Sequence, residues 1–496
     1  MNFIKGANRN QIIIFPEIMD DYISEDNAVR VIDAYVEHLD LEYLGFTKAK
    51  PNNTGRPMYS AEDMLKLYIY GYMNRSRSSR RLEIETKRNV EVIWLLRKLS
   101  PDHKTISKFR KDNRKVLKNV FRDFVKLCME LGLYGKELIA VDGSRFQAVN
   151  SKEKNYNHEK LRNRIKRLDV KINQYFEELD IMDQEENDEE VKVSKEKINS
   201  IINELKEKKD KYQKMREEMK AEGVKQKSLT DPDSRRMTTA HGGSMIAYNV
   251  QSVVDAEKKL VAEFEVTNAG NDKGQLSIMS KKAMEILEVD HITAIADAGY
   301  NVGTDIGECI LNNIEPHVSM KEEYITICIP VDEKDTNQPK EFENGRLVYY
   351  KDRNLAICPM GKVLSPMTYR KSRGVAIFAS AKACNHCEHR CHKAKSPTKQ
   401  HEVTMKQEAF SREYDVSNLY VKQIQVKKDN KLLKRRKATV EHPFGTIKRT
   451  MDSAYCLMKG LESVQGEFSL TFLAYNLKRA INIVGAKELI EAMQMR

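Results

Sequence analysis

The sequence lacks long apolar runs and is poor in cysteine. None of its segments approaches the roughly 18 consecutive apolar residues of a membrane-spanning helix, and residues 1–18 have no apolar core followed by a small-residue cleavage site, as a signal peptide would. The eight cysteines among 496 residues are too sparse for a disulfide scaffold. We therefore expect no membrane partner, a cytoplasmic location with reduced thiols, and a metal site wherever cysteines cluster.

Basic residues outnumber acidic ones. The chain has 85 Lys and Arg against 73 Asp and Glu, a formal net charge of +12, and a pI near 9.0. Such an excess favours a polyanionic partner, although net charge says nothing about fold. Nucleic acid is therefore the first partner class to consider. A chain of this length is expected to hold about two to four domains.

Residues 1–130 are predicted to form an all-helical domain. Ser60 to Asp63 has the form of a capping box, and after a break at residues 100–102 a basic helix is predicted over 106–127, with Thr105 as its cap. Two short helices followed by a basic one resemble a helix-turn-helix, so we interpret this region as binding DNA ends; the plain alternative is a solvated helical face. The expected DNA contacts are the basic residues of the loop 74–81 and of the third helix, namely Arg75, Arg77, Arg80, Arg81, Lys108, Arg110, Lys111 and Arg114.

A mixed α/β core is predicted to follow. Residues 137–142 form a short apolar run that ends in an acid and a glycine, as a strand leaving a core does. Further elements are expected in the order strand, strand, helix and strand, over residues 245–255, 260–267, 272–287 and 291–297. This order is typical of a mixed sheet with covering helices. Residues 432–490 are predicted to be helical, with Glu441 near the start.

Residues 158–222 are predicted to form an antiparallel coiled-coil hairpin inserted into this core. Apolar residues recur in alternating steps of four and three from Leu161 to Met182, an acidic break follows at 183–190, and a similar spacing resumes at Ile198. The pattern leaves three roles open: a plain structural insert, a dimerisation arm or a DNA clamp.

Three acids stand where metal-dependent chemistry needs them. Asp142 and Asp297 each end a predicted strand, and neighbouring strands would bring them together. Glu441 lies among basic residues, which suits a site that binds both metal and phosphate; these neighbours are Arg435, Arg436, Lys437 and Lys448. Carboxylates held close together would repel unless cations intervened, and two Mg²⁺ or Mn²⁺ ions about 3.5–4 Å apart can support in-line displacement at phosphorus. Taken singly, each acid is more typical of a turn or a helix start.

Three segments resemble the acid motifs of the DDE transposases of bacterial insertion sequences. They are residues 141–148 (VDGSRFQA), 297–300 (DAGY) and 440–448 (VEHPFGTIK), and their order and separations also match. Further family-like stretches extend the resemblance over almost the whole chain, at 100–110, 231–237 and 248–251. The resemblance implies an RNase-H-like catalytic domain, residues 131–320 and 431–490, whose metal ions are held by Asp142, Asp297 and Glu441. Lys448 takes the place of a lysine that such enzymes carry seven residues after the glutamate.

The activity that this resemblance implies is transposition. Water would hydrolyse the phosphodiester at each end of an insertion sequence, and the freed 3′-hydroxyl would attack target DNA. The partners would be double-stranded DNA, as terminal inverted repeats and as target, and a second copy of the chain, because two ends must be held together. Two alternatives stay open: a metal-dependent nuclease that does not rejoin DNA, and a non-catalytic DNA-binding protein derived from a transposase.

Residues 321–430 are predicted to be an insertion that carries a cysteine cluster. Cys358 precedes a group with the spacing C-x2-C-x3-C, formed by Cys384, Cys387 and Cys391. Four thiolates with such spacing can bind one structural Zn²⁺ tetrahedrally. The alternative is a loop with reduced thiols.

Overall fold

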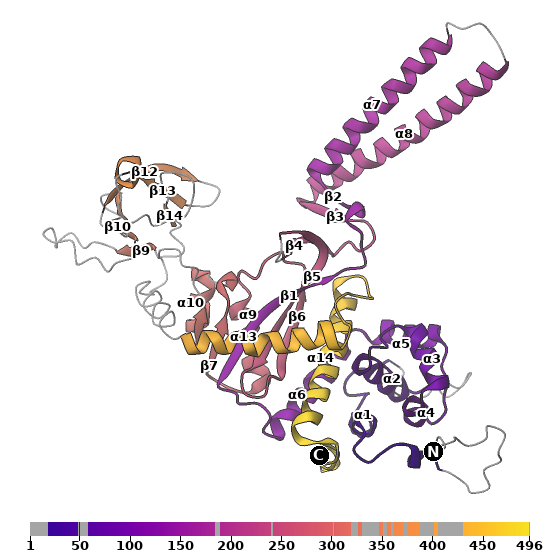
Figure 1. Cartoon of the computed structure of the whole chain (residues 1–496), viewed down its shortest axis with the longest axis vertical. Coiled ribbons are helices and arrows are strands. Elements are labelled where there is room, and N and C mark those ends of the chain that lie inside the picture. Colours follow the sequence, from indigo (N-terminus) through magenta and orange to yellow (C-terminus); the bar gives the residue numbers. More distant parts are fainter. Residues whose placement is uncertain are drawn as a thin grey trace, which may run out of the picture.

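The computed structural model has four parts, which Figure 1 shows: N-terminal helices, a central mixed sheet with its helices, a long helical arm and a small second sheet. The structure describes residues 18–47, 49, 58–183, 189–239, 242–300, 302–318, 326–329, 347–350, 355–358, 362–370, 375–385, 401–404 and 430–495. Within these ranges no helix is both long and apolar enough to cross a membrane.

In the N-terminal part, the described residues form a 3-10 turn (Met19–Tyr22) and six α-helices. The helices are α1 (Ala28–Glu37), α2 (Ala61–Met73), α3 (Ser79–Arg88), α4 (Val90–Leu95), α5 (His103–Asn113) and α6 (Leu117–Glu130). The Ser60 hydroxyl accepts a hydrogen bond from the Asp63 N–H at 3.0 Å, which confirms the predicted cap. The single helix predicted over 106–127 is wrong, because α5 begins at His103, capped by the Asp102 side chain, and ends well before α6 starts.

The break between α5 and α6 has a packing reason. At this point the backbone passes α14 (Leu461–Val484) so closely that a Cβ added to Gly466 would lie 2.6 Å from the Arg114 carbonyl oxygen. The side chain of Asn113 is also engaged, since it accepts the Thr47 N–H at 2.8 Å. The turn between the two helices therefore lets the chain follow α14.

The central sheet is mixed, as predicted. Its strands are β1 (Leu138–Gln147), β4 (Arg235–Thr238), β5 (Ser244–Asp255), β6 (Val261–Thr267), β7 (Ile292–Ala296) and β8 (Ile314–Val318). β1 lies in the middle, antiparallel to β5 and parallel to β7. β5 also pairs antiparallel with β4 and β6, and β7 pairs parallel with β8. Helices α9 (Leu276–Leu287) and α10 (Gly303–Leu311) connect β6 to β7 and β7 to β8.

β1 is longer than the run 137–142 predicts. It continues to Gln147 because β5 pairs with it residue by residue as far as Ala247. Asp142 therefore lies inside the strand, and Gly143 is a strand residue and not the start of a turn. Backbone pairing with β5 prevails over the turn propensity of the sequence Asp142-Gly143-Ser144.

The C-terminal region is mostly helical. α13 (Asn430–Gly445) continues into a π-helical turn (Thr446–Thr450), and α14 and α15 (Ala486–Gln494) follow only after an irregular segment. Pro443 lies inside α13, where it removes a backbone N–H from the helix. Glu441 thus lies near the end of its helix. The prediction that it lies near the start is wrong. α14 is buried along most of its length, and its Phe468 meets Phe146 of β1 at a ring-centroid distance of 4.6 Å.

The predicted helical hairpin is confirmed. α7 (His158–Asp183) and α8 (Glu189–Ala221) pack together through a core of Ile172, Ile198 and Ile202. A short antiparallel ladder of β2 (Asn155–Asn157) and β3 (Gln226–Ser228) closes its base. Figure 1 shows this arm projecting away from the rest of the chain.

The region 321–430 contains a second sheet that the sequence patterns did not predict. Its order is β14-β13-β12-β11-β10-β9, and a short helix, α11 (Ala381–Asn385), follows β13. The strands are β9 (Thr326–Ile329), β10 (Leu347–Tyr350), β11 (Leu355–Ile357), β12 (Val363–Arg370), β13 (Val375–Ala379) and β14 (His401–Thr404).

A buried ion pair joins the helical part to α14. The Arg77 guanidinium lies 3.1 Å from the Glu467 carboxylate, and the two side chains are only 5% and 1% exposed. Arg77 also donates hydrogen bonds to the carbonyls of Asp452 and Tyr455, and Glu467 accepts the N–H groups of Leu457 and Met458. Both charges are therefore fully engaged, as buried charges need to be.

Glu467→Ala should strongly destabilise the protein, because it leaves the Arg77 charge buried without a partner. We expect the free energy of unfolding to fall by about 3–5 kcal/mol, measured by urea denaturation. The control is Lys208→Ala, which removes an exposed ion pair on the arm and should cost less than about 1 kcal/mol. Equal losses in the two variants would contradict the role assigned to the buried pair.

Candidate functional site

The register of the sheet brings Asp142 and Asp297 to the same level. Ala140 of β1 pairs with Ile295 of β7, and β7 ends at Ala296. Two residues beyond that pair, Asp142 and Asp297 stand side by side and, because side chains alternate along strands, on the same face. The structure thus brings together the two aspartates that the sequence singles out.

The surroundings of Asp142 disfavour the ionised form of its carboxyl group. Its side chain is 23% exposed. Burial, followed by the nearby carboxylates of Asp297 and Asp272, raises the pKa of Asp142 to about 7, although Arg436 acts in the opposite direction. The Arg436 guanidinium lies 3.9 Å from the Asp142 carboxylate. A second positive charge would relieve this crowding, as a divalent cation does.

Asp272 is a third carboxylate at this place, and the sequence analysis missed it. It lies in the turn before α9 and accepts hydrogen bonds from Asn249 Nδ2 at 2.8 Å and Gln251 Nε2 at 2.6 Å, both on β5. Gln251 in turn accepts the Tyr300 hydroxyl. The signal in the sequence was weak, because Asn-Asp-Lys before a helix is typical of an ordinary turn.

Gly143 makes room for this arrangement. A Cβ added there would lie 2.3 Å from Asp272 Oδ1 and 2.3 Å from Gln251 Nε2. Any larger residue would displace the carboxylate that stands next to Asp142. The glycine after the first acid is therefore needed for close packing at the site, and not for a turn.

Lys448 approaches the same strand from the π-helical turn. Its ammonium donates to Ser144 Oγ at 2.6 Å and to the Arg145 carbonyl at 3.0 Å, and it lies 4.5 Å from the centroid of the Phe146 ring. Burial lowers the pKa of Lys448, while Asp142 acts in the opposite direction. π-helical turns are frequent at functional sites. Lys448 thus places a positive charge beside Ser144, which is two residues from Asp142 along β1.

Glu441 does not join the aspartates in this structure. Its side chain is 63% exposed and lies 3.8 Å from the Lys437 ammonium, one turn earlier on α13. At about 100° per residue, Glu441 lies about 140° around the helix from Arg436, the residue that faces Asp142. Among the residues that the structure describes, no three His, Cys, Asp or Glu side chains are arranged to hold a metal ion.

Two family models match the chain. Residues 17–112 match the family described as "Transposase domain (DUF772)", and residues 357–481 match "Transposase DDE domain". The chain is related to the DDE transposases of insertion sequences. The resemblance seen in the motifs is thereby confirmed. The second match includes Glu441 and Lys448, whereas Asp142 and Asp297 lie outside both matches.

The other comparisons add little to this relationship. No curated protein matches the chain. Among solved structures, the piggyBac transposase in a synaptic complex with hairpin DNA is similar to it, with 8% identity, a TM-score of 0.29, and coverage of 95% of this chain and 80% of that one. The fold of this transposase relative therefore rests on its own strand order.

Two of the basic residues expected to contact DNA lie inside the protein, and a third is paired where it is partly exposed. Arg77 is buried against Glu467, and Arg110, 7% exposed, donates to the Tyr72 hydroxyl at 3.1 Å. Arg114 is paired with Glu462 of α14. The Arg77 and Arg114 guanidinium groups hold the helical part against α14, whereas Arg110 is bonded within the helical part. Arg75 is exposed, and in α13 Arg435 and Lys437 are exposed while Arg436 faces Asp142.

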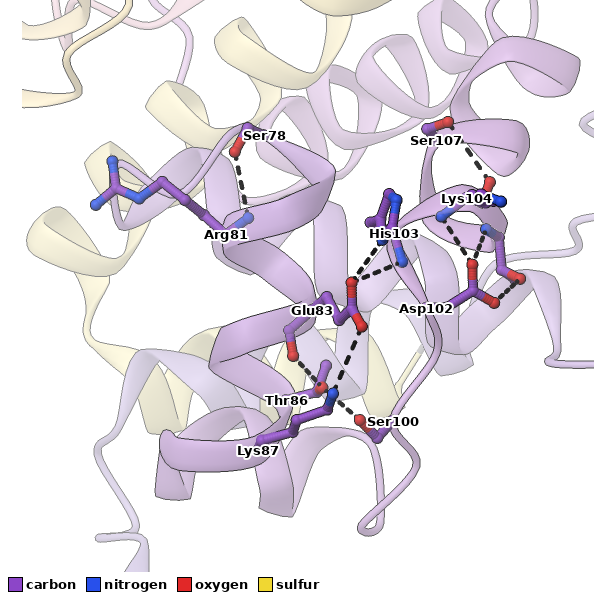
Figure 2. Close-up of polar contacts among 11 residues, drawn as sticks. Ser78, Arg81, Glu83, Thr86, Lys87, Ser100, Asp102, His103, Lys104 and Ser107 are labelled. Carbon is purple, nitrogen blue, oxygen red and sulfur yellow. Dashed lines mark hydrogen bonds and ion pairs between the residues drawn. The ribbon is translucent and has the colours of Figure 1, made fainter.

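Other basic residues of α3 and α5 are exposed. Arg80 and Arg81 on α3 and Lys108 and Lys111 on α5 present their side chains to solvent. Figure 2 shows how the two helices are joined. The Glu83 carboxylate accepts the backbone N–H of His103 at 3.1 Å and lies 2.8 Å from the Nδ1 atom of the His103 ring. Arg81 points away from this network. The two helices thus form one unit with exposed positive charge.

The proposed zinc ligands are only partly within the described residues. Cys358 follows β11, and its sulfur accepts the Lys362 N–H at 3.3 Å. Cys384 lies in α11. Cys387 and Cys391 lie outside the residues that the structure describes. The zinc site therefore stays a prediction.

The raised pKa of Asp142 should make the metal-free protein less stable as pH rises. A pKa that is higher in the folded than in the unfolded chain contributes stability that is complete below about pH 4 and is lost as the pH rises through about 7. Between pH 5 and 8 in EDTA, the free energy of unfolding should fall by at most about 3 kcal/mol more in the natural chain than in Asp142→Asn.

Urea denaturation at both pH values measures this difference. The control is Asp290→Asn, an exposed aspartate at the opposite end of β7, which should keep the pH dependence of the natural chain. Identical profiles for the natural chain and Asp142→Asn would show that burial and the neighbouring carboxylates do not raise the pKa of Asp142.

Proposed function

We propose that this chain is a transposase that cuts and rejoins DNA with two divalent metal ions at the Asp142 site. The observation that carries the proposal is the register of β1 and β7, which sets Asp142 and Asp297 side by side at one end of the sheet. The strand order supports the RNase-H-like arrangement that the family resemblance implies, since β1 stands between an antiparallel and a parallel neighbour. Within this fold, both aspartates belong to segments that resemble DDE motifs.

The residues present fit magnesium or manganese. The donors are carboxylate oxygens, which these ions prefer, and the mutual repulsion of Asp142, Asp297 and Asp272 is of the kind that cations relieve. When bound, such ions would activate water for attack at phosphorus and stabilise the leaving oxygen. The chain would hold them through Asp142 and Asp297, with Glu441 as the third ligand that the resemblance implies.

The basic residues around the acids would position the DNA backbone. Arg436, next to Asp142, has the forked geometry that binds a phosphate through two hydrogen bonds, and Lys448 offers a point charge already aimed at β1. Because Arg436 faces Asp142 and Lys448 contacts the same strand, both would bind the phosphate that reaches the aspartates. The freed 3′-hydroxyl would then be held at the same place for its attack on target DNA.

Asp142→Asn and Asp297→Asn should each abolish cleavage. We expect rates to fall by at least about 10³-fold with Mg²⁺ or Mn²⁺, because the ions lose a charged ligand. The assay uses duplexes taken from the DNA that flanks the gene, and it scores both nicking and joining of a pre-cut end to plasmid. Asp290→Asn is the control and should keep full activity. Retained cleavage in either aspartate variant would remove that residue from the site.

The same assay separates the third ligand from the remaining alternatives. Loss of activity in Glu441→Gln with activity kept in Asp272→Asn supports the DDE assignment, and the reverse result assigns the third carboxylate to Asp272. Cleavage without joining would indicate a nuclease. No cleavage by the natural chain with either ion would indicate a DNA-binding protein derived from a transposase.

We also propose that α3 and α5 bind the element ends. Changing Arg81 and Lys108 together to Ala should weaken binding of the flanking duplex and reduce the slope of log K against log salt by about 0.9 for each phosphate that the variant no longer neutralises. Fluorescence anisotropy between 50 and 200 mM salt measures this slope. The control Lys487→Ala removes an exposed charge from α15. An unchanged slope in the double variant would exclude this face from DNA binding.

A further inference from the structure

The arm has two halves of opposite charge. Next to the body, residues 158–171 and 205–221 carry thirteen basic and six acidic residues. The rest of the segment, residues 172–204, carries eleven acidic and three basic residues. The charge reverses close to the middle of α7 and of α8. A structural insert needs no such division, because the two helices are already held together by their apolar seam.

One face of α7 presents this division to solvent. Lys166, Val170, Glu177 and Ile181 are spaced so that they lie on one side of the helix, opposite the seam that includes Ile172. All four are exposed, and the apolar side chains of Val170 and Ile181 are 52% and 62% exposed. The ion pairs described within the arm join other residues, such as Lys209 with Asp169 and Lys208 with Glu204.

We propose that this face of α7 binds the same face of a second copy of the chain, with the two arms antiparallel. A two-fold axis through the middle of the arms would place Lys166 of each copy opposite Glu177 of the other, because the point midway between these residues is also where the charge reverses. The basic inner half of one arm would lie along the acidic outer half of its partner. A two-fold interface is self-complementary in this way.

This arrangement accounts for observations that DNA binding by the arm leaves unexplained. A DNA clamp would use the basic inner half, but the acidic outer half would be repelled by phosphate. Exposed Val170 and Ile181 are of no use against a phosphate backbone, whereas apolar side chains framed by charges are typical of protein interfaces. The arm projects clear of the body, so a second arm can reach it (Figure 1).

Charge reversal at the proposed contact tests the arrangement. Sedimentation velocity of the full chain without DNA should show a dimer at 50 mM salt that weakens at 500 mM, because salt screens exposed charges. Lys166→Glu and Glu177→Lys should each raise the dimer dissociation constant at least about tenfold. The double variant Lys166→Glu/Glu177→Lys should restore the natural value, since the pair is re-formed with its signs exchanged.

The control Lys171→Glu makes the same charge change about 140° around the helix and should leave association nearly unaltered. Far-ultraviolet circular dichroism shows whether each variant keeps its helices. A chain that stays monomeric at 50 mM salt, or a double variant no better than the single ones, would overturn the proposal. It would also be overturned if Lys166→Glu weakened binding to a random duplex without changing association, since the arm would then bind DNA. None of these measurements depends on cleavage, so they hold or fail apart from the proposed activity.

Discussion

The buried contact between Arg77 and Glu467 connects the parts of this structure that matter for its site. Arg77 begins the α3 region, and Glu467 belongs to α14, the helix that the sheet and the N-terminal helices share. Together they hold the segment after the π-helical turn through its backbone. That segment reaches β1, where the Cys456 N–H donates to the Gln147 carbonyl at 2.8 Å. Asp142 therefore lies on a strand whose far end is held by the helical part.

Around Asp142 the structure maintains an unfavourable concentration of negative charge. Asp142 is partly buried with Asp297 and Asp272 nearby, and Arg436 and Lys448 oppose this negative charge from α13 and the turn after it. The arrangement persists because Asp272 is held by two side-chain amides and because Gly143 has no Cβ to push it away. Packing thus holds these carboxylates close together against their mutual repulsion, as is common at sites that bind a cation.

Elements with a clear period could be predicted from the sequence, and those that depend on distant partners could not. β5, β6, β7 and the arm follow their apolar patterns. That Asp142 and Asp297 lie side by side could also be predicted, because each acid follows an apolar run. By contrast, the extension of β1 through Gly143 depends on β5, a hundred residues later in the chain. The outward direction of Glu441 depends on which side of α13 packs against the sheet.

The basic residues show the same limit most clearly. In the sequence Arg77 and Arg80 are equivalent members of one basic loop, yet Arg77 is buried against Glu467, which lies 390 residues away along the chain, while Arg80 is exposed. Charge alone could not distinguish them, because burial of a cation depends on a carboxylate supplied by tertiary structure.

The same reasoning clarifies where the net positive charge acts. Residues 158–221 together carry sixteen basic and seventeen acidic residues, so the arm contributes nothing to the excess of +12. The rest of the chain is therefore at +13, of which +6 lies in residues 321–430 and +7 in the part that includes the exposed faces of α3 and α5 and the basic residues of α13 beside Asp142. A polyanion is therefore attracted to the chain outside the arm, and the part that holds the aspartates is itself positively charged. The arm, neutral as a whole but divided along its length, is suited to recognise a charge pattern and not a uniform polyanion.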